Sequence, residues 1–350
     1  QILYGPLLDR FGRKPPIYIG LALFIAASVL CMFSRDIRWL VIMRFIQAVA
    51  GCAAGISAMA MVRDFFPVHE TAKIISLLIL ILGVSPLLAP TVGGFIAVHW
   101  GWRSVFIVLA LFALLNILVC WWYLPDGHKP DASVSLKPGP ILRNFVEVFK
   151  DPQFTTYSVS GSFSFSGLLV YVASSSIVFM EAFHVTAQQF GMIFAGLAVG
   201  FIGSNQINVL LLRRFSSDKI YLAMLLVECP MATVLLAGTY FGWFGLWPTL
   251  VLLFITLSSL GLAFPNAAAL AITPFDRNIG SATAMLGFVQ IGVSSLASAL
   301  IGVFDSHAML PVVLILAVTA WIGLAVLLIG KRRIPELRYV EEQGADLLTD

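Results

Sequence analysis

A short charged segment near the beginning of the chain carries residue types that can lock two helix ends together. The segment holds one acid, three bases and two glycines: Gly5, Asp9, Arg10, Gly12, Arg13 and Lys14. Asp9 can accept charge-assisted hydrogen bonds from these cations or from the N-terminus of a neighbouring helix. Gly12 can supply the positive φ that a tight turn between helices needs. We expect a gating turn here; the alternative is an ordinary short basic loop.

One cation interrupts the apolar stretch 39–62. Arg44, Gln47 and Gly51 recur at helical spacing and therefore share one face of the helix predicted there. An ionisable group inside an apolar span indicates a functional role by default, so this face is our candidate proton path. The alternative is that Arg44, which lies close to one end of the helix, extends to the membrane interface.

Prolines and glycines share a stripe on the helix predicted over 74–98. The stripe contains Gly83, Pro86, Pro90, Gly93 and Gly94. Two prolines four residues apart remove two backbone donors and bend a helix, and small residues let another helix approach closely. The stripe predicts a bent helix that packs and flexes against the second half of the chain. An ordinary kinked, glycine-rich membrane helix is the alternative.

Polar side chains also recur on the apolar segments of the second half. Those that we predict to line a substrate cavity are Tyr157, Ser164, Tyr171, Asn205, Asn266 and Gln290. A roomy apolar cavity with few fixed polar contacts suits small, varied amphipathic molecules. The alternative for each residue is a hydrogen bond that joins two helices, worth on average about 0.6 kcal/mol in a membrane.

Glu228 is the only carboxylate well inside a predicted span of this half. It either binds and releases a proton during transport or hydrogen-bonds the backbone that Pro230 leaves unpaired. The residues themselves leave both roles open.

Residues that bind metals or nucleotides form no pattern. The four cysteines lie in separate apolar segments, and the five histidines lie at or beyond the ends of apolar runs. No G-x-x-x-x-G-K-[ST] loop occurs, which disfavours ATP-driven transport. We predict no metal, no cofactor and no enzymatic activity.

The elements that position these residues are apolar helices. The chain has 350 residues, of which 59% are hydrophobic and 11% charged, and its mean hydropathy is +0.95. A soluble domain carries about 25% charged residues, so the composition indicates an integral membrane protein. The net charge of +3 is too small and too dispersed for a nucleic-acid partner.

Apolar runs with at most one charge, each long enough to cross a bilayer at about 20 residues, predict ten complete helices. They cover 16–34, 39–62, 74–98, 104–124, 153–180, 190–212, 220–241, 248–272, 281–303 and 310–330. Residues 1–8 resemble the last turns of a further helix, so we expect a chain that opens inside a helix. An aromatic, glycine-containing segment at 241–248 predicts the turn between two of the spans.

Lys and Arg residues orient the spans. Seventeen of the 21 lie in loops on one side, which we therefore predict to be cytoplasmic together with the tail, 331–350. The longest polar stretch, 125–152, contains five prolines and an amphipathic piece at 141–149. It divides the chain into an N-terminal bundle over 1–124 and a C-terminal bundle over 153–330, with a cytoplasmic linker between them.

Three of these patterns resemble motifs of the major facilitator superfamily. The segment 5–15 resembles the loop 2–3 signature (G-x-L-x-D-R-x-G-R-K), and 44–51 resembles the helix-4 motif, although Ala48 replaces its usual glycine. The stretch 85–94 resembles the helix-5 motif of the exporters, and prolines at both 86 and 90 are most similar to the bicyclomycin and chloramphenicol resistance (Bcr/CflA) group.

The resemblance implies an all-α integral membrane protein with two six-helix bundles, of which helix 1 and most of helix 2 are missing here. It implies a multidrug efflux transporter of the bacterial inner membrane that exchanges protons for small amphipathic drugs by alternating access. It also implies that Arg44 assists proton transfer and that the main proton-carrying acid lies in helix 1. It places the helix of Glu228 at the periphery of the fold, which favours the structural role of that residue beside Pro230. We expect a monomer. Proton-linked uptake of a small polar metabolite is the alternative.

Overall fold

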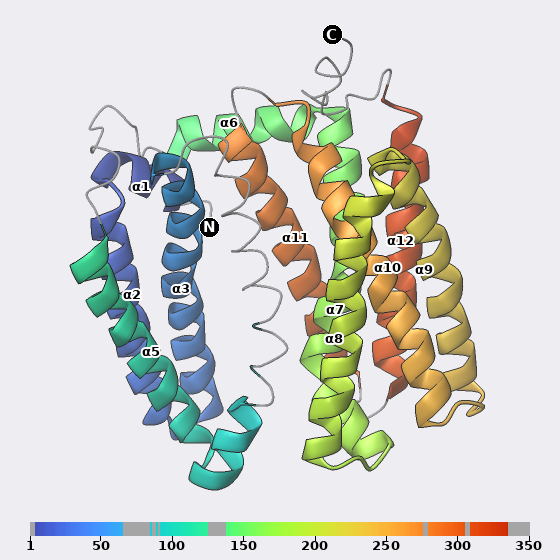
Figure 1. Cartoon of the computed structure of the whole chain (residues 1–350), viewed down its shortest axis with the longest axis horizontal. Helices are drawn as coiled ribbons and strands as arrows, with labels where there is room; N and C mark the ends of the chain where they lie inside the picture. Colours follow the sequence, from blue (N-terminus) through green and yellow to red (C-terminus); the bar gives the residue numbers. More distant parts are fainter. Residues whose placement is uncertain are drawn as a thin grey trace. The chain divides into compact units, whose positions relative to one another are not determined.

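The computed structural model describes residues 4–65, 85, 89, 92–124, 138–275, 279–304 and 309–334 (Figure 1). Within these ranges, nine helices are long and apolar enough to cross a membrane. The predicted all-α membrane class is therefore confirmed. The predicted helix 74–98 lies mostly outside the described residues.

The chain divides into two compact units at residues 141 and 142. The labelled helices of unit 1 are α1 (Tyr4–Phe11), α2 (Lys14–Met32), α3 (Ile37–Phe65) and α5 (Trp102–Tyr123). Residues 92–100 are also helical. α2 packs against both α3 and α5 (Figure 1). The two helices α2 and α3 approach closely at Gly20, where a Cβ atom would collide with Ala53.

The helix α6 (Pro138–Lys150) spans the division between the units, and unit 2 continues with six membrane-length helices. These are α7 (Pro152–Ala182), α8 (Ala187–Leu211), α9 (Ser217–Tyr240), α10 (Leu246–Ile272), α11 (Ile279–Ile301) and α12 (Met309–Lys331). α7 contacts α10, α11 and α12, while α9 contacts α10 and α12. The core of unit 2 therefore lies between α7, α9, α10 and α12.

Local sequence signals explain where several helices begin. Asp151 caps α7 by accepting hydrogen bonds from the backbone N–H groups of residues 153 and 154, both at 2.9 Å. Thr186 and Gln189 form a reciprocal capping box at the start of α8. Between α9 and α10 the chain turns at Gly242, whose φ is +67°. The predicted turn at 241–248 is confirmed.

The membrane-length helices agree with their predicted limits to within a few residues. Two differences matter for the site. α1 continues through Asp9 and Arg10 to Phe11, so the charged turn is shorter than predicted. α3 extends to Phe65, beyond the predicted end at residue 62. Both extensions keep backbone groups hydrogen-bonded within a helix, which the membrane environment requires.

The cysteines are all free thiols. Cys31 and Cys229 are fully buried, and Cys52 and Cys120 are half-buried. Cys229 packs as a small apolar side chain in the core of unit 2, and Cys120 packs against a cluster that contains Ile17 and Leu21 of α2.

Candidate functional site

The predicted gating turn joins α1 to α2 at Gly12. Its φ is +81° and it is buried, so a residue with a side chain would be strained there. The predicted need for an unusual φ is confirmed. Arg10 lies in the last turn of α1, with its guanidinium carbon 5.9 Å from the ring centroid of Phe11.

The remaining members of the predicted turn are distributed over the two helix ends. Gly5 and Asp9 are residues of α1. The side chain of Asp9 lies outside the described part of the structure. Arg13 occupies the N-cap position of α2, and Lys14 is its first residue. The three bases thus lie on the two helix ends that Gly12 joins.

Two of the three predicted proton-path residues, Arg44 and Gln47, belong to a series of hydrogen bonds that runs from α3 into α2. The guanidinium of Arg44 donates to the Gln47 amide oxygen. The Gln47 amide nitrogen donates to the Ser28 hydroxyl oxygen at 2.5 Å, and Ser28 donates to the backbone oxygen of Phe24 at 2.7 Å. Each of these three donors has one acceptor, so the hydrogen bonds all run in the same direction, from Arg44 to the backbone oxygen of Phe24.

The inner end of this series of hydrogen bonds is buried while its outer end is not. Ser28 and Gln47 are 0% and 1% exposed, whereas the Arg44 side chain is exposed. The Arg44 guanidinium carbon also lies 5.9 Å from the ring centroid of Phe106 on α5. The arginine is thus oriented by a buried amide, and it presents its remaining donors outward.

Gly51 lies on the same helix but makes no close contact. A Cβ atom there would lie 3.5 Å from the ring of Phe24, which is ordinary van der Waals distance. The face of α3 that packs inside unit 1 contains Met43, Gln47 and Ala50. The predicted face that includes Arg44 and Gly51 therefore borders the packed face and does not coincide with it.

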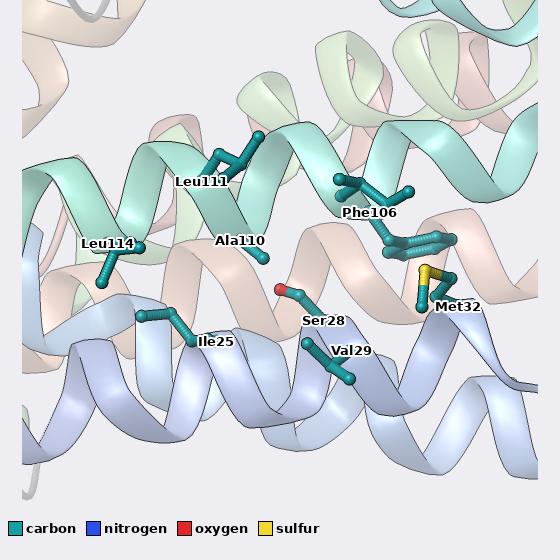
Figure 2. A pocket seen from close by; sticks show the side chains of 9 residues that line it. Ile25, Ser28, Val29, Met32, Phe106, Ala110, Leu111 and Leu114 are labelled. Atoms are coloured by element: carbon teal, nitrogen blue, oxygen red, sulfur yellow. The ribbon is translucent and has the colours of Figure 1, made fainter. Parts of the chain in front are cut away.

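An apolar cavity of about 330 Å³ lies between α2 and α5. It is lined by Ile25, Ser28, Val29, Met32, Phe106, Ile107, Ala110, Leu111 and Leu114. Figure 2 shows the Ser28 side chain pointing from α2 toward α5. The serine that accepts from Gln47 is therefore also the polar residue of this apolar lining.

The structure describes only part of the predicted bent helix over 74–98. Gly83, Pro86 and Pro90 lie outside the described residues. Gly93 and Gly94 belong to the helical segment 92–100, and no described atom lies within 4 Å of a Cβ built on either. The predicted role of this stripe stays a prediction.

Three of the predicted cavity residues make contacts inside unit 2. Ser164 donates to a carboxylate oxygen of Glu228 at 2.7 Å. Asn266 on α10 donates to the amide oxygen of Asn208 on α8 at 2.7 Å. The buried ring of Tyr171 stacks on Phe194 with centroids 5.7 Å apart. Each of these side chains therefore joins two helices of the unit.

The other three predicted cavity residues differ in burial. Tyr157 is fully buried, and its ring centroid lies 5.9 Å from that of Tyr221. Tyr157 and Gln290 line one small cavity of about 10 Å³, which is near the lower limit for a single water molecule. Asn205 and Gln290 are half-buried.

Several residues of these networks were not predicted. Ser28 and Asn208 carry no signal of their own, because the sequence does not show which residues face each other across two helices. Tyr221 carries one: it precedes Glu228 by seven residues and therefore shares its helix face. Among the described residues, no three His, Cys, Asp or Glu side chains gather into a metal site.

Comparison with known proteins gives consistent matches over most of the chain. The family model described as Major Facilitator Superfamily matches residues 1–290. The chain is 26% identical over 301 residues to the bicyclomycin resistance protein homolog of Haemophilus influenzae, covering 86% of this chain and 75% of that protein. It is 30% identical over 339 residues to the uncharacterized MFS-type transporter YdgK of Bacillus subtilis, covering 92% and 80%.

Two further matches agree with these. Multidrug resistance protein D of Escherichia coli is 26% identical over 305 residues, which cover 85% of this chain and 74% of that protein. A bacterial homolog of the human lysosomal transporter Spinster, solved in an inward-facing and unoccupied conformation, aligns with a TM-score of 0.67 at 16% identity. That alignment covers 96% of this chain and 86% of the other and shows a shared fold.

Proposed function

Because the chain belongs to the Major Facilitator Superfamily, we propose that it is a secondary transporter that exports small amphipathic drugs in exchange for protons. Two of its relatives are named for resistance to bicyclomycin or to several drugs. The sequence motif shared with the exporter branch of the superfamily, at 85–94, supports the same direction of transport.

The observation that carries the proposal is the oriented arginine of α3. Arg44 lies within a membrane span, and its guanidinium is held by Gln47, which is held in turn by Ser28. A fixed cation in a membrane stabilises a nearby carboxylate and so favours release of its proton. A charge with this orienting support suits a proton-transfer step better than a purely structural contact with the interface.

The other predicted residues receive roles within this proposal. The basic turn around Gly12, with Asp9, would latch the cytoplasmic gate. The stripe with Pro86 and Pro90 would let its helix bend and seal. Substrate would be bound mainly by apolar contact, with amides such as Asn205 and Gln290 as polar contacts.

The protein is a multi-pass membrane protein. We place it in the bacterial inner membrane as a monomer, with lipid, protons and small amphipathic drugs as its partners. The excess of Lys and Arg in alternate loops supports a cytoplasmic C-terminus. Cysteine labelling of the tail in intact cells and in opened cells would test this orientation.

The central test is proton release driven by drug. Inverted vesicles that contain the intact transporter would be acidified, and bicyclomycin or chloramphenicol would be added. We expect the drug to dissipate the pH gradient with the wild-type protein and with Arg35→Ala, because Arg35 is an exposed arginine outside the spans.

Arg44→Ala and Asp9→Asn should abolish the signal while the protein still reaches the membrane. Wild-type signals from both variants would contradict the roles given to these residues. A drug-dependent signal only in vesicles of the opposite orientation would instead favour proton-linked uptake.

A further inference from the structure

Glu228 is a carboxyl group enclosed entirely by protein. It lies in the middle of α9 and is 1% exposed. This burial arises from the neighbouring helices of unit 2, before any lipid is considered. A bilayer around the unit would remove Glu228 further from water.

The carboxyl has a hydrogen-bond donor but no cation to balance a charge. Ser164 on α7 donates to its Oε2 atom at 2.7 Å. Glu228 forms no ion pair with any residue that the structure describes. Lys331, the one cation of α12, pairs with Asp218 at the beginning of α9, with 3.6 Å between nitrogen and oxygen.

The elements packed around Glu228 carry few other titratable groups. α10 carries none within its bounds. α7 carries Tyr157, Tyr171 and Glu181, and the last of these is exposed near the helix end. On α9 itself, the buried groups nearest in sequence are Cys229 and Tyr221. None of these groups carries a positive charge.

Most serines of α7 hydrogen-bond within their own helix. Five of them, Ser158, Ser162, Ser166, Ser174 and Ser175, donate to carbonyl oxygens of α7, as serines in membrane helices commonly do. Ser160 and Ser164, one turn apart, instead donate to other helices. The Ser164 proton is therefore directed specifically at Glu228.

A second hydrogen-bonded group lies one turn along α7. Ser160 donates to the Gly323 carbonyl oxygen on α12 at 2.7 Å. Because its single proton is used there, the 2.6 Å contact with Tyr221 has the tyrosine as donor. Two hydrogen-bonded pairs therefore join α7 to α9: Ser160 with Tyr221 and Ser164 with Glu228. Glu228 is the one carboxyl group of these pairs.

The balance of energies favours an uncharged carboxyl at this position. An ionised carboxylate buried without a cation loses several kcal/mol of hydration. One hydrogen bond to a charged group returns only about 1.5–3 kcal/mol. A carboxylic acid hydrogen-bonded to a serine avoids this deficit.

We propose that Glu228 is a proton-binding site of the C-terminal unit, with Ser164 as its hydrogen-bond partner. Binding forms one O–H bond on the carboxyl and removes one negative charge; release breaks that bond and passes the proton to water. The site deepens the proposed function, since it supplies a carboxyl within the described chain that can hold an exchanged proton. Its existence does not depend on the identity of the substrate.

Infrared difference spectroscopy of the reconstituted full chain tests the proposal without substrate. At neutral pH we expect a C=O stretching band of a protonated carboxyl in the wild-type protein and its loss in Glu228→Gln. Glu181→Gln, which changes an exposed carboxyl of α7, should leave the band unchanged.

Ser164→Ala gives a second, independent readout. Removal of the hydroxyl should shift the same band to higher frequency, because the carboxyl loses a hydrogen bond. This variant also keeps the test decisive if Glu228→Gln folds poorly. Carboxylate bands that disappear in Glu228→Gln at neutral pH, with no protonated-carboxyl band in the wild type, would overturn the proposal. Failure of the drug-driven proton assay alone would contradict the proposed function and leave this site intact.

Discussion

The side-chain amide of Gln47 on α3 donates a hydrogen bond to the hydroxyl oxygen of Ser28 on α2, 2.5 Å away, while its own oxygen accepts from Arg44. Both Ser28 and Gln47 are buried. The orientation of a cation on one helix thus depends on a small polar residue of another helix.

Ser28→Ala should destabilise the protein and weaken proton-coupled transport. The substitution leaves a buried amide N–H of Gln47 without its acceptor, which costs about 1–3 kcal/mol, and it frees the orientation of Arg44. Thermal unfolding in detergent measures the first effect, and drug-driven proton release measures the second.

Ser104→Ala is the matched control, because the Ser104 hydroxyl donates to the Trp100 carbonyl oxygen at an exposed position. Its effect should stay within about 0.5 kcal/mol. Equal stability of the two variants would contradict the importance of the bond between Gln47 and Ser28.

Gly20→Ala should loosen the contact between α2 and α3. A Cβ atom at this position would collide with the Ala53 Cβ and lie 3.1 Å from the Ala50 carbonyl oxygen. Overpacking of this kind costs about 1–3 kcal/mol, so the midpoint of thermal unfolding should fall.

Gly55→Ala should act in the opposite direction. No described atom lies within 4 Å of a Cβ atom at residue 55, and alanine is favoured over glycine in a helix interior by up to about 1 kcal/mol. The two substitutions are chemically identical and lie in contacting helices. Effects of the same sign and size would show that α2 and α3 are not packed as described.

Ala110→Leu should be tolerated, because Ala110 faces the 330 Å³ cavity between α2 and α5. Added methyl groups can occupy that space and bury apolar area. Ala113→Leu, one turn further along α5, should instead reduce stability by about 1–3 kcal/mol. Ala113 is 5% exposed and packs in a cluster with Ile17 and Leu21. Thermal unfolding of both variants gives the comparison, and a larger loss for Ala110→Leu would contradict the cavity.

Arg103→Lys should weaken the connection between the end of α2 and the beginning of α5. Arg103 donates to the carbonyl oxygens of Met32 and Ser34, at 3.1 and 3.3 Å, and lies 4.6 Å from the ring centroid of Trp102. A lysine cannot reproduce this forked geometry, and we expect a loss of about 1 kcal/mol for these partly exposed contacts. Protease sensitivity of the segment between α2 and α3 is the measurement. Wild-type resistance in both Arg103→Lys and Arg103→Ala would contradict this role.

Helix positions were predictable because segments that lie in lipid are apolar, while charged residues gather in the loops that contact water. Long apolar runs with at most one charge predicted the membrane spans. The limits of α10 and α12 agree with the prediction to within two residues. The amphipathic piece at 141–149 was predictable for a different reason: α6 alternates buried residues such as Phe145 and Val148 with the exposed ion pair of Arg143 and Glu147.

The partners of buried polar residues were not predictable. In a membrane helix the lipid-facing side is as apolar as the packed side, so hydropathy does not reveal which face turns inward. The sequence placed Gln47 on the same helix face as Arg44. It did not predict that Gln47 donates a hydrogen bond to Ser28 on α2. Glu228 was recognised as an interior acid, and a bond to the backbone near Pro230 was favoured. The bond found joins it to Ser164.

The serine-rich composition of α7 has a mechanical consequence. Most of its serine hydroxyls donate to its own backbone, so they do not tie the helix to its neighbours. The hydroxyls of α7 that donate to other helices are those of Thr155, Ser160 and Ser164, which bond to α6, α12 and α9. Interhelical hydrogen bonds in membranes are worth on average about 0.6 kcal/mol each, so the hydroxyl bonds that join α7 to other helices contribute only about 2 kcal/mol. The position of α7 therefore depends mainly on its packing against α10, α11 and α12, and its hydroxyl groups add little resistance to a change in that position.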